Sequence, residues 1–354
     1  MYLFYRGDRI RTCDLRDPNA ALYQAEPRPD NEQYAIMAST FMQRLTRATA
    51  GFVVGIDAGG TRVRVALADA RGGAVVAEDQ APALPDGGPG SAVSVLAGIL
   101  TGMPPCSPCL AVCAGIAKAT RAGVMGAWER ELKALLPDAV FVGVPDYQIA
   151  YHAAIVGETG VLVVAGTGSV SYAERGGATV RVGGRGWDYG DEGSGAWLTT
   201  DLVRRTLRAL DGLGPASTLT TSVCDELGAR QPSALAEAAR ARSQSEGRGF
   251  LVPLALARAK AGDSEAVDLF VGAAGWLALL ARTAAHRLEF SKEAIFPVAT
   301  AGGIWNAGDL VRLPFDVVLR RSFPHMFLQR GTATPVQGAV RLARRALGHG
   351  GVSD

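Results

Sequence analysis

Lysine is scarce in this sequence, and the positions of its lysines exclude one large class of nucleotide-binding protein. The 354 residues contain only Lys118, Lys133, Lys260 and Lys292, and none of them follows a glycine. A Walker P-loop requires a Gly-Lys pair, because its lysine contacts the terminal phosphates of the nucleotide. The chain therefore does not bind a nucleotide through a P-loop.

Other common catalytic signatures are missing as well. No Gly-x-Gly-x-x-Gly sequence joins an expected strand to a helix, and no Gly-x-Ser-x-Gly nucleophile elbow occurs. His286 and Arg287 are followed by leucine, where the catalytic loop of a protein kinase has aspartate. These absences exclude the dinucleotide-binding fingerprint, the hydrolase elbow and the protein-kinase fold as explanations for the glycine-rich turns described below.

The charge balance and the apolar runs indicate neither a polyanion nor a membrane as partner. The 36 basic residues are balanced by 34 acidic ones, so the formal net charge is only +2. The one long uncharged stretch, between Asp86 and Lys118, is interrupted by Pro104, Pro105 and Pro108. A membrane-spanning helix needs about twenty uninterrupted apolar residues. We therefore expect a soluble protein that binds neither nucleic acid nor membrane.

The sequence has few cysteines, and their number is odd. The chain has five cysteines, and its first fifty residues lack the apolar run of a signal peptide, so we expect reduced thiols and a cytoplasmic location. Cys106, Cys109 and Cys113 have a spacing that could begin an iron–sulfur or zinc site. Cys113, however, lies in an apolar segment typical of a buried strand, where cysteine packs as a small hydrophobic residue. We favour the packing role.

Glycine is nearly absent from the first fifty residues, which contain only Gly7 of the 44 glycines. This segment has little hydrophobic periodicity, and three prolines interrupt it. Residues 7–24 resemble peptides that arise when a transfer-RNA gene region upstream of a true start codon is translated. We expect residues 1–50 to be a disordered arm or an artefact of start-codon assignment, with the native protein then beginning at Met37 or Met42.

From residue 51 onwards, apolar segments alternate with glycine-bearing turns, which predicts strands joined by tight turns. A three-stranded antiparallel meander is predicted twice, and this repetition indicates an internal duplication. We therefore expect an α/β fold with two lobes, residues 51–150 and 151–354. The first meander comprises 52–57, 63–67 and 74–77, and the second comprises 161–165, 170–173 and 178–182.

The remaining periodicities predict the helices and strands that complete the two lobes. The longest helix has an apolar stripe that includes Phe270, Leu277 and Ala284. Helices are predicted over 91–101, 127–136, 193–210, 250–261, 264–290 and 335–347, and strands around Cys113, over 140–144 and 295–300, and near Val317.

The first glycine turn combines a carboxylate with backbone amides that could bind an anion. Asp57 ends the first expected strand, and Gly59, Gly60 and Thr61 follow it. Glycine lets backbone amides converge on a phosphate without interference from a β-carbon. A carboxylate at a strand end can also hold the hydration shell of a Mg²⁺ ion that bridges nucleotide phosphates. Taken alone, the same residues would equally make an ordinary hairpin turn.

Four glycine-bearing motifs occur in a fixed order along the chain: Asp57-Ala58-Gly59-Gly60-Thr61, Gly166-Thr167-Gly168-Ser169, Gly190-Asp191-Glu192-Gly193-Ser194-Gly195 and Ala301-Gly302-Gly303-Ile304-Trp305. Together they resemble the BadF/BadG/BcrA/BcrD-type ATPase family, and within it the N-acetylglucosamine and glucosamine kinases. The resemblance covers nearly all of residues 51–347. It implies a duplicated actin-like (ribonuclease H-like) ATPase fold, with two lobes and ATP in the cleft between them.

The resemblance also implies which residues bind the nucleotide. The first and second motifs would hold the phosphates, and the fourth would lie against the adenosine. Asp57 would hold Mg²⁺ through water. The implied ATP-binding residues are Asp57, Gly59, Gly60, Thr61, Gly166, Thr167, Gly168, Ser169, Gly302 and Gly303.

By the same resemblance, Asp146 matches the catalytic base of the family. An aspartate that accepts the proton of a sugar hydroxyl, and holds that hydroxyl in line with the γ-phosphoryl group, suits a reaction that depends on positioning. Gly184, Gly186 and Asp191 match the sugar-binding loop. Each aspartate also has a structural interpretation: Asp146 could cap a helix over 150–156, and Asp191 a helix that begins at Gly193.

The sequence departs from the family pattern at positions that bear on the sugar. Arg185 stands where the family has a tryptophan, and Trp187 comes later in the loop. Leu84 is near the position of a family asparagine, and a hydroxyl found in some relatives is missing around Ala114. A sugar hydroxyl that loses such a hydrogen bond needs another partner, and Asp86 is a candidate. We therefore expect an amino-sugar kinase without specifying the sugar.

Two alternatives to a sugar kinase come from other functional classes. The ATPase activators of reductases and dehydratases belong to the same family, but they usually have a cysteine near the second turn and a Gly-Gly-Gln-Asp segment, and this chain has neither. A non-catalytic sugar or nucleotide sensor could use the same cleft. The presence of both Asp57 and Asp146 favours an active enzyme. The expected partner is a small-molecule sugar, and the resemblance also allows a homodimer.

Overall fold

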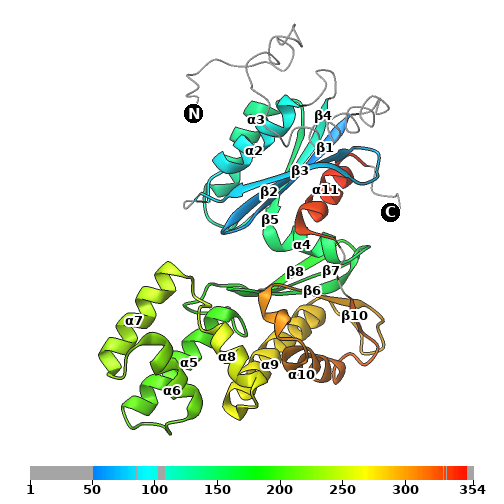
Figure 1. Ribbon diagram of the computed structural model, residues 1–354. Helices are drawn as coiled ribbons and strands as arrows, with labels where there is room; N and C mark the ends of the chain where they lie inside the picture. The colour runs from blue at the N-terminus through cyan, green and yellow to red at the C-terminus, as the bar shows by residue number, and fades with distance from the viewer. Residues whose placement is uncertain (1–50, 85–86, 103–107, 330, 332, 349–354) are drawn as a thin grey trace, which may run out of the picture. The chain divides into compact units, whose positions relative to one another are not determined.

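The structure, a computed structural model, describes residues 51–84, 87–102, 108–329, 331 and 333–348. The chain divides into two compact units (Figure 1): unit 1 runs to Ile149 and includes the segment from Pro335, whereas unit 2 is Ala150–Thr334. The expected division near residue 150 agrees with this boundary, but the expected second lobe, 151–354, is wrong at its end because its last helix packs in unit 1. Residues 1–50, with both candidate start positions, lie outside the described residues.

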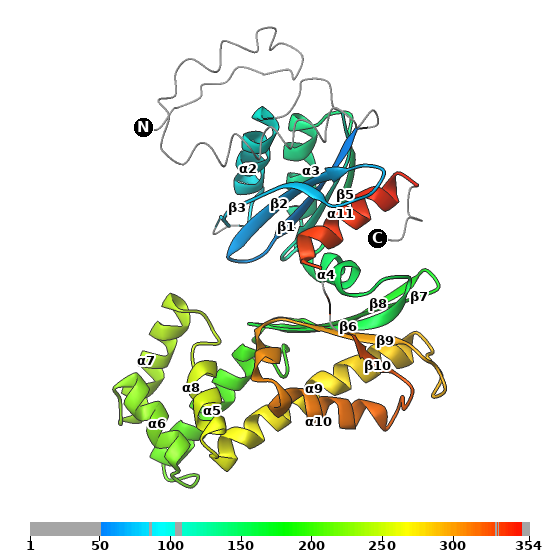
Figure 2. The ribbon, with the colours of Figure 1, turned by 45° about the vertical axis from the view of Figure 1, so that its right-hand side comes forward.

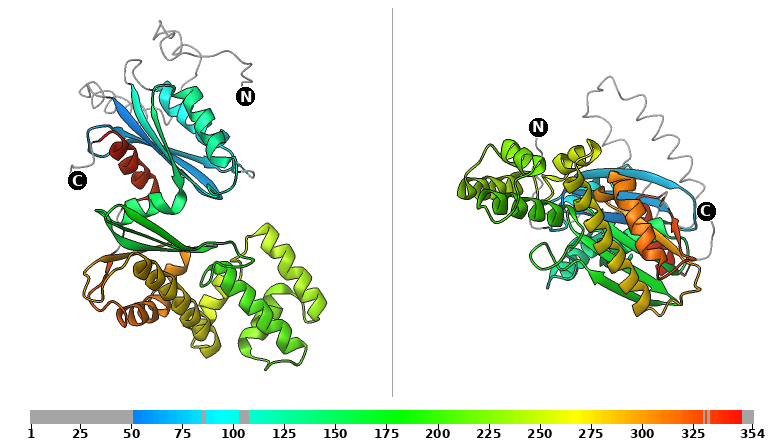
Figure 3. Two further views of the ribbon diagram at one scale, coloured as in Figure 1. Left: turned by 180° about the vertical axis from the view of Figure 1, so that it is seen from behind. Right: turned by 90° about the horizontal axis from the view of Figure 1, so that it is seen from below.

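Unit 1 is built on a five-stranded mixed sheet in the order β3-β2-β1-β4-β5. The first three strands form the expected antiparallel meander, and β4 and β5 run parallel to β1. Helices α2 and α3 pack on one face of the sheet and α11 on the other (Figures 1 and 3). The elements are β1 Phe52–Ala58, β2 Arg62–Asp69, β3 Val75–Pro82, α2 Gly90–Thr101, β4 Cys109–Ile116, α3 Val124–Leu135, β5 Val140–Pro145, α4 Asp146–Ala154 and α11 Pro335–Ala346.

Strand β1 is apolar along its length because helices cover both faces of the sheet. Val54 and Ile56 pack in the cluster that contains α2 and α3, whereas Val53 packs in the cluster that contains α11. Such a doubly covered strand shows a continuous apolar run and not an alternation. Gly55 lies under α11, and a β-carbon at this position would be 2.6 Å from the carbonyl oxygen of Val336. The glycine therefore lets the last helix approach the first strand.

Unit 2 repeats the sheet of unit 1, which confirms the expected duplication. Its strand order is β10-β9-β6-β7-β8, with an antiparallel meander β6-β7-β8 and with β9 and β10 parallel to β6. Written from the other edge, this order and these directions match unit 1 strand for strand. The strands are β6 Thr159–Ala165, β7 Ser169–Arg175, β8 Ala178–Gly183, β9 Pro297–Ala301 and β10 Phe327–Gln329.

The core of unit 2 is organised by the 24-residue helix α9, Ser264–Arg287, which crosses the sheet (Figure 2). The predicted apolar stripe is confirmed, because Phe270, Leu277 and Ala284 are fully buried. Among the described residues, α9 alone is long and apolar enough to cross a membrane by length and composition. Its buried stripe against β6, β7 and β8 is that of a core helix.

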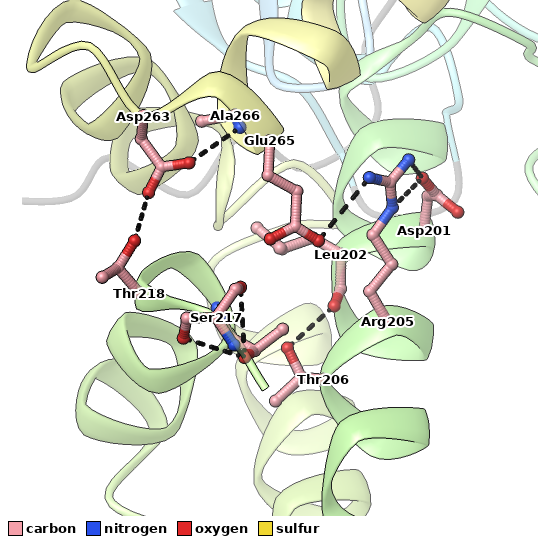
Figure 4. Close-up of polar contacts among 10 residues, drawn as sticks. Asp201, Leu202, Arg205, Thr206, Ser217, Thr218, Asp263, Glu265 and Ala266 are labelled. Carbon is pink, nitrogen blue, oxygen red and sulfur yellow. Dashed lines mark hydrogen bonds and ion pairs between the residues drawn. The ribbon is translucent and has the colours of Figure 1, made fainter. Parts of the chain in front are cut away.

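Four further helices, α5 Gly195–Leu210, α6 Thr218–Leu227, α7 Pro232–Ser245 and α8 Val252–Lys260, extend unit 2 beside α9. Polar contacts join them to the start of α9 (Figure 4). Thr218 Oγ1 donates to Asp263 Oδ2 at 2.8 Å. Arg205 binds Asp201 at 2.9 Å and lies 3.8 Å from Glu265. These contacts tie α5 and α6 to the start of α9.

The predicted strand near Val317 is wrong. Val317 lies in helix α10, Asp309–Arg320, which packs on α9 and follows the short 3₁₀ helix Gly303–Ala307. The β-branched pair at 317 and 318 favours a strand by local propensity. The burial of Val311, Phe315 and Leu319 at helical spacing overrides that propensity.

The contact between α11 and β1 gives a test of the fold. Gly55→Ala should destabilise unit 1 by about 3 kcal/mol, because the new β-carbon overlaps the backbone of α11 and not a side chain that can move. Differential scanning calorimetry, which separates the transitions of different units, would measure the change.

Gly98→Ala is the matched control for this test. Gly98 is an exposed residue of α2 with no atom near the new β-carbon, so alanine should stabilise the helix by up to about 1 kcal/mol. Equal, small effects of the two substitutions would contradict the packing of α11 on β1.

Candidate functional site

The carboxyl ends of three parallel strands bring the predicted residues of unit 1 together. The register aligns Ala58 of β1 with Ile116 of β4, and Ile116 with Pro145 of β5. Asp57 and Asp146 therefore lie at one edge of the sheet, and the charge of Asp146 raises the pKa of Asp57. In open α/β sheets, ligands bind at this edge.

Asp57 is a largely buried carboxylate, with its side chain 16% exposed. Burial raises its pKa to about 6; the guanidinium of Arg64, 3.7 Å away, opposes the rise, and the charges of Asp146 and Glu78 add to it. A divalent cation nearby would favour the ionised form. The chemistry of this carboxylate therefore fits the hydrated Mg²⁺ that the sequence predicts.

Asp146 is the first residue of α4 and directly follows β5. Its Oδ1 accepts a hydrogen bond from the backbone N–H of Tyr147 at 2.9 Å, and a carboxylate is favoured at a helix N-terminus. The helix expected over 150–156 is therefore wrong in extent, since it begins at Asp146 itself. Gly115 of β4 positions this helix, because a β-carbon there would overlap the side chain of Ile149.

A small pocket lies at the same edge of unit 1, beside the first turn. Gly59 and Gly60 form part of its lining, and nothing obstructs the space above Gly60. Leu84 adds an apolar wall, and Trp128 holds the loop by donating its Nε1–H to the carbonyl of Gly87 at 3.2 Å. Thr61 is exposed at the end of the turn. Asp86 lies outside the described residues.

In unit 2, the second turn joins β6 to β7 and is held by the start of α5. The amide of Gly166 donates to the carbonyl of Gly168 at 2.9 Å. The amides of Gly195 and Ala196 donate to the carbonyls of Gly166 and Thr167 at 2.8 and 3.1 Å. A second contact comes from Ser169, whose hydroxyl donates to the carbonyl of Glu192 at 2.7 Å.

Asp191 packs against this second turn. Its backbone has a left-handed conformation with φ 58°, and its carboxylate accepts hydrogen bonds from the amides of Ser169 and Gly186. Burial nevertheless raises its pKa. The alternative role as a helix cap is wrong, because α5 begins at Gly195 and its cap is Ser194, whose Oγ accepts from the amide of Trp197 at 3.2 Å.

The glycine pair at the end of β9 meets the second turn. Gly302 has φ 102°, and a β-carbon there would overlap the carbonyl oxygen of Ala165. A β-carbon built on Gly166 would be 4.0 Å from the amide of Gly303. The ends of the parallel strands β6 and β9 thus present backbone without side chains, and a phosphate or ribose can approach such a surface closely.

The loop from β8 to α5 contains a contact that the sequence did not reveal. Gly184 and Gly186 have φ values of 65° and 98°, and the guanidinium of Arg181 donates to the carbonyl of Gly184. The guanidinium of Arg248 stacks 3.4 Å from the centre of the Trp187 ring. The sequence carries no local signal for this pair, because the partners are far apart along the chain.

Cys109 and Cys113 are thiols of β4, the first partly buried and the second buried. Burial raises the pKa values of both to about 12, so both are protonated in the free protein. Cys106 lies outside the described residues. Within the described part of the chain, no three His, Cys, Asp or Glu side chains gather in a group that could hold a metal ion.

The buried charge of Asp57 gives a prediction about stability and pH. The unfolded chain releases the Asp57 proton near pH 4, whereas the folded chain holds it until about pH 6. The folded state therefore loses stability as pH rises from 4 to 6, by on the order of 3 kcal/mol.

Asp57→Asn removes this penalty, so we expect the variant to exceed the wild type in stability above pH 6 and to approach it near pH 4. Urea unfolding of both proteins at intervals between pH 4 and 8 measures the difference. A difference that does not change with pH would contradict the raised pKa.

Comparison with known proteins assigns the chain to a protein family. The BadF/BadG/BcrA/BcrD ATPase family matches residues 54–343. The N-acetyl-D-glucosamine kinase of Dictyostelium discoideum is 32% identical over 188 residues, which are 52% of this chain and 59% of that protein. The glucosamine kinase of Vibrio cholerae is 31% identical over 143 residues, 40% of this chain and 48% of that protein. The chain thus matches about half the length of these curated relatives.

Solved structures support the fold. A proposed N-acetylglucosamine kinase of Chromobacterium violaceum superposes with a TM-score of 0.64 and 29% identity, over 83% of this chain and 99% of that chain. A second proposed N-acetylglucosamine kinase, of Porphyromonas gingivalis, gives 0.60 at 17% identity, over 84% and 99%, which bears on the fold alone. The expected duplicated, actin-like α/β fold is confirmed. The match to residues 54–343 contains all four glycine motifs, and the chain belongs to the BadF/BadG/BcrA/BcrD ATPase family.

Proposed function

We propose that this protein is an ATP-dependent kinase that phosphorylates a hydroxyl group of an amino sugar of the N-acetylglucosamine or glucosamine type. The observation that carries the proposal is the placement of Asp57, the first glycine turn and Asp146 at one edge of the unit 1 sheet. The similarity to the N-acetyl-D-glucosamine and glucosamine kinases supports the substrate class.

Asp146 is the general base in this proposal. A sugar hydroxyl is a weak nucleophile, and a carboxylate that accepts its proton also orients its oxygen toward the phosphoryl group. The position of Asp146 at the first residue of α4 suits this role, because the hydrogen bond from Tyr147 N–H and the helix N-terminus favour the ionised carboxylate. Ile149, seated over Gly115, keeps the helix close to the sheet.

The glycine turns hold the nucleotide in this proposal. When bound, Mg²⁺–ATP supplies the phosphoryl group and the positive charge that the transfer needs. Asp57 would hold the ion through water, and the amides around Gly59 and Gly60 would bind the phosphates. In unit 2, the second turn, residues 166–169, would lie against the phosphates, and Gly302 and Gly303 would leave room for the adenosine.

The apolar side chains beside the first turn support an N-acylated sugar over a free amine in this proposal; the pocket itself, of about 30 Å³, has room for little more than a methyl group or a water molecule. Its described lining contains apolar groups, which include Val63, Leu84 and Trp128, and no carboxylate. Lys118 is the one charged residue of that described lining, and its ammonium group would repel the ammonium group of glucosamine. An acetamido methyl group instead gains contact with the apolar wall. Gly184, Gly186 and Asp191, which match the sugar-binding loop of the family, are also assigned to the sugar in this proposal.

A panel of acceptors tests the function and the substrate together. We expect ADP release to require a sugar, and kcat/KM for N-acetylglucosamine to exceed that for glucosamine by about tenfold, which corresponds to one unfavourable or missing contact. Glucose and N-acetylmuramic acid complete the panel. ADP release that no sugar stimulates would overturn the proposal in favour of an ATPase activator or a sensor.

Asp146→Asn tests the general base. The amide cannot accept the hydroxyl proton, so kcat should fall by about 10²- to 10⁴-fold. The affinity for a non-hydrolysable ATP analogue should change little. Asp138→Asn is the matched control, because Asp138 is an exposed aspartate of the α3–β5 connection, and it should leave kcat unchanged. An Asp146→Asn enzyme with kcat near that of the wild type would refute the assignment.

A further inference from the structure

Arg248 lies in the connection between α7 and α8, and this connection packs close to the second turn. A β-carbon built on Gly195, the first residue of α5, would be 3.4 Å from the Cα of Gly249. The amide of Gly195 in turn donates to the carbonyl of Gly166 at 2.8 Å. A single residue, Gly195, therefore separates the backbone beside Arg248 from the second turn.

The far end of the Arg248 side chain is held by the β8–α5 loop. Its guanidinium stacks 3.4 Å from the centre of the Trp187 ring. The same loop packs against the second turn, because a β-carbon on Gly168 would be 2.8 Å from Asp191 Oδ2. Both ends of the Arg248 side chain are thus attached to segments that contact this turn. A side chain held in this way has already lost rotamer freedom, so ordering it around a ligand costs little.

The half-buried guanidinium of Arg248 has no acceptor among the residues that the structure describes. It makes no hydrogen bond and no ion pair with them, and its contact with Trp187 is made through its face. Arg242 and Arg258, on the helices before and after it, each pair with a carboxylate. The five N–H donors of arginine lie in the plane of the guanidinium, so stacking on a ring leaves them available to a bound anion.

We propose that Arg248 is a further nucleotide-binding residue, which donates hydrogen bonds to a phosphate group of the nucleotide at the second turn. The inference rests on the proposed function. The carboxylate of Asp191 beside Gly168 places a negative charge where a polyanion would have to bind. A guanidinium offsets that charge, and its donors match two oxygens of one phosphate group.

The alternative is that Arg248 only fastens the β8–α5 loop to the α7–α8 connection through its contact with Trp187. The two roles differ in how the ligand matters. Loss of a fastening contact disturbs the site for every ligand that it binds. Loss of a phosphate contact weakens only ligands that have phosphate groups, and the loss is greatest at low ionic strength because the contact is between charges.

Calorimetry on the full chain separates the two roles. The Kd values of adenosine, of ADP with Mg²⁺ and of a non-hydrolysable ATP analogue with Mg²⁺ are measured for the wild type and for Arg248→Gln. We expect the substitution to raise the Kd of ADP or of the ATP analogue by about tenfold or more, the contribution of one hydrogen bond to a charged group. The Kd of adenosine should stay close to that of the wild type.

Three further variants complete the test. Arg248→Lys keeps the charge without the planar fork, so its loss of affinity should be smaller, and it carries the test if Arg248→Gln does not fold. Trp187→Leu keeps Arg248 but removes its support, and should weaken the same nucleotides by less than Arg248→Gln does. Arg204→Gln is the matched control, since Arg204 is an exposed arginine of α5, and it should keep the affinities of the wild type.

The outcomes are distinguishable. If Arg248→Gln weakens adenosine as much as the ATP analogue, Arg248 only fastens the loop and the inference is wrong. The inference is also wrong, while the proposed function stands, if the variant binds every nucleotide like the wild type, or if only its binding of N-acetylglucosamine or N-acetylmuramic acid is weakened. If the wild type binds no nucleotide, the proposed function fails, and the inference fails with it.

Discussion

The close approach of backbone to backbone at positions without a β-carbon is the constraint on which this structure depends. In unit 1, Gly55 admits the last helix of the chain onto the first strand, so that both faces of the sheet are covered. In unit 2, Gly302 brings the end of β9 against the end of β6. The first contact completes a core, and the second creates a surface of bare amides. The same chemical property of glycine thus serves both stability and the candidate site.

The duplication determines where the functional groups lie. In each unit a central strand is followed by a glycine turn and an antiparallel neighbour, and the next parallel strand lies on its other side. In unit 1 the first turn and Asp146 therefore lie together at the carboxyl ends of the parallel strands. In unit 2 the second turn and Gly302 lie together at the same ends. The units differ in what is attached to this edge. Unit 1 supplies buried acids, and unit 2 supplies amides and the loop that contains Asp191.

Local signals in the sequence predict the strands and turns, but not the contacts between distant segments. The two meanders and the stripe of α9 follow from apolar periodicity, and the structure confirms them. Helices α6 and α7 were not predicted. In α7 the cause is its composition, which is rich in alanine and charged residues and leaves little apolar stripe. The contact of Gly55 with Val336, the stacking of Arg248 on Trp187 and the contact of Asp191 with Gly168 join residues that no short window compares.

Two aspartates, Asp57 in unit 1 and Asp191 in unit 2, illustrate opposite solutions to burying a carboxylate. Asp191 receives two backbone amides, which offset part of its burial and fix its direction. Asp57 has one distant guanidinium and two nearby acids, so its ionised form is poorly compensated in the free protein. A group in the second situation gains most from a bound cation, because the cation offsets the part of the burial penalty that Arg64 leaves. If the ion binds as the proposed function requires, its binding energy adds to the stability of unit 1.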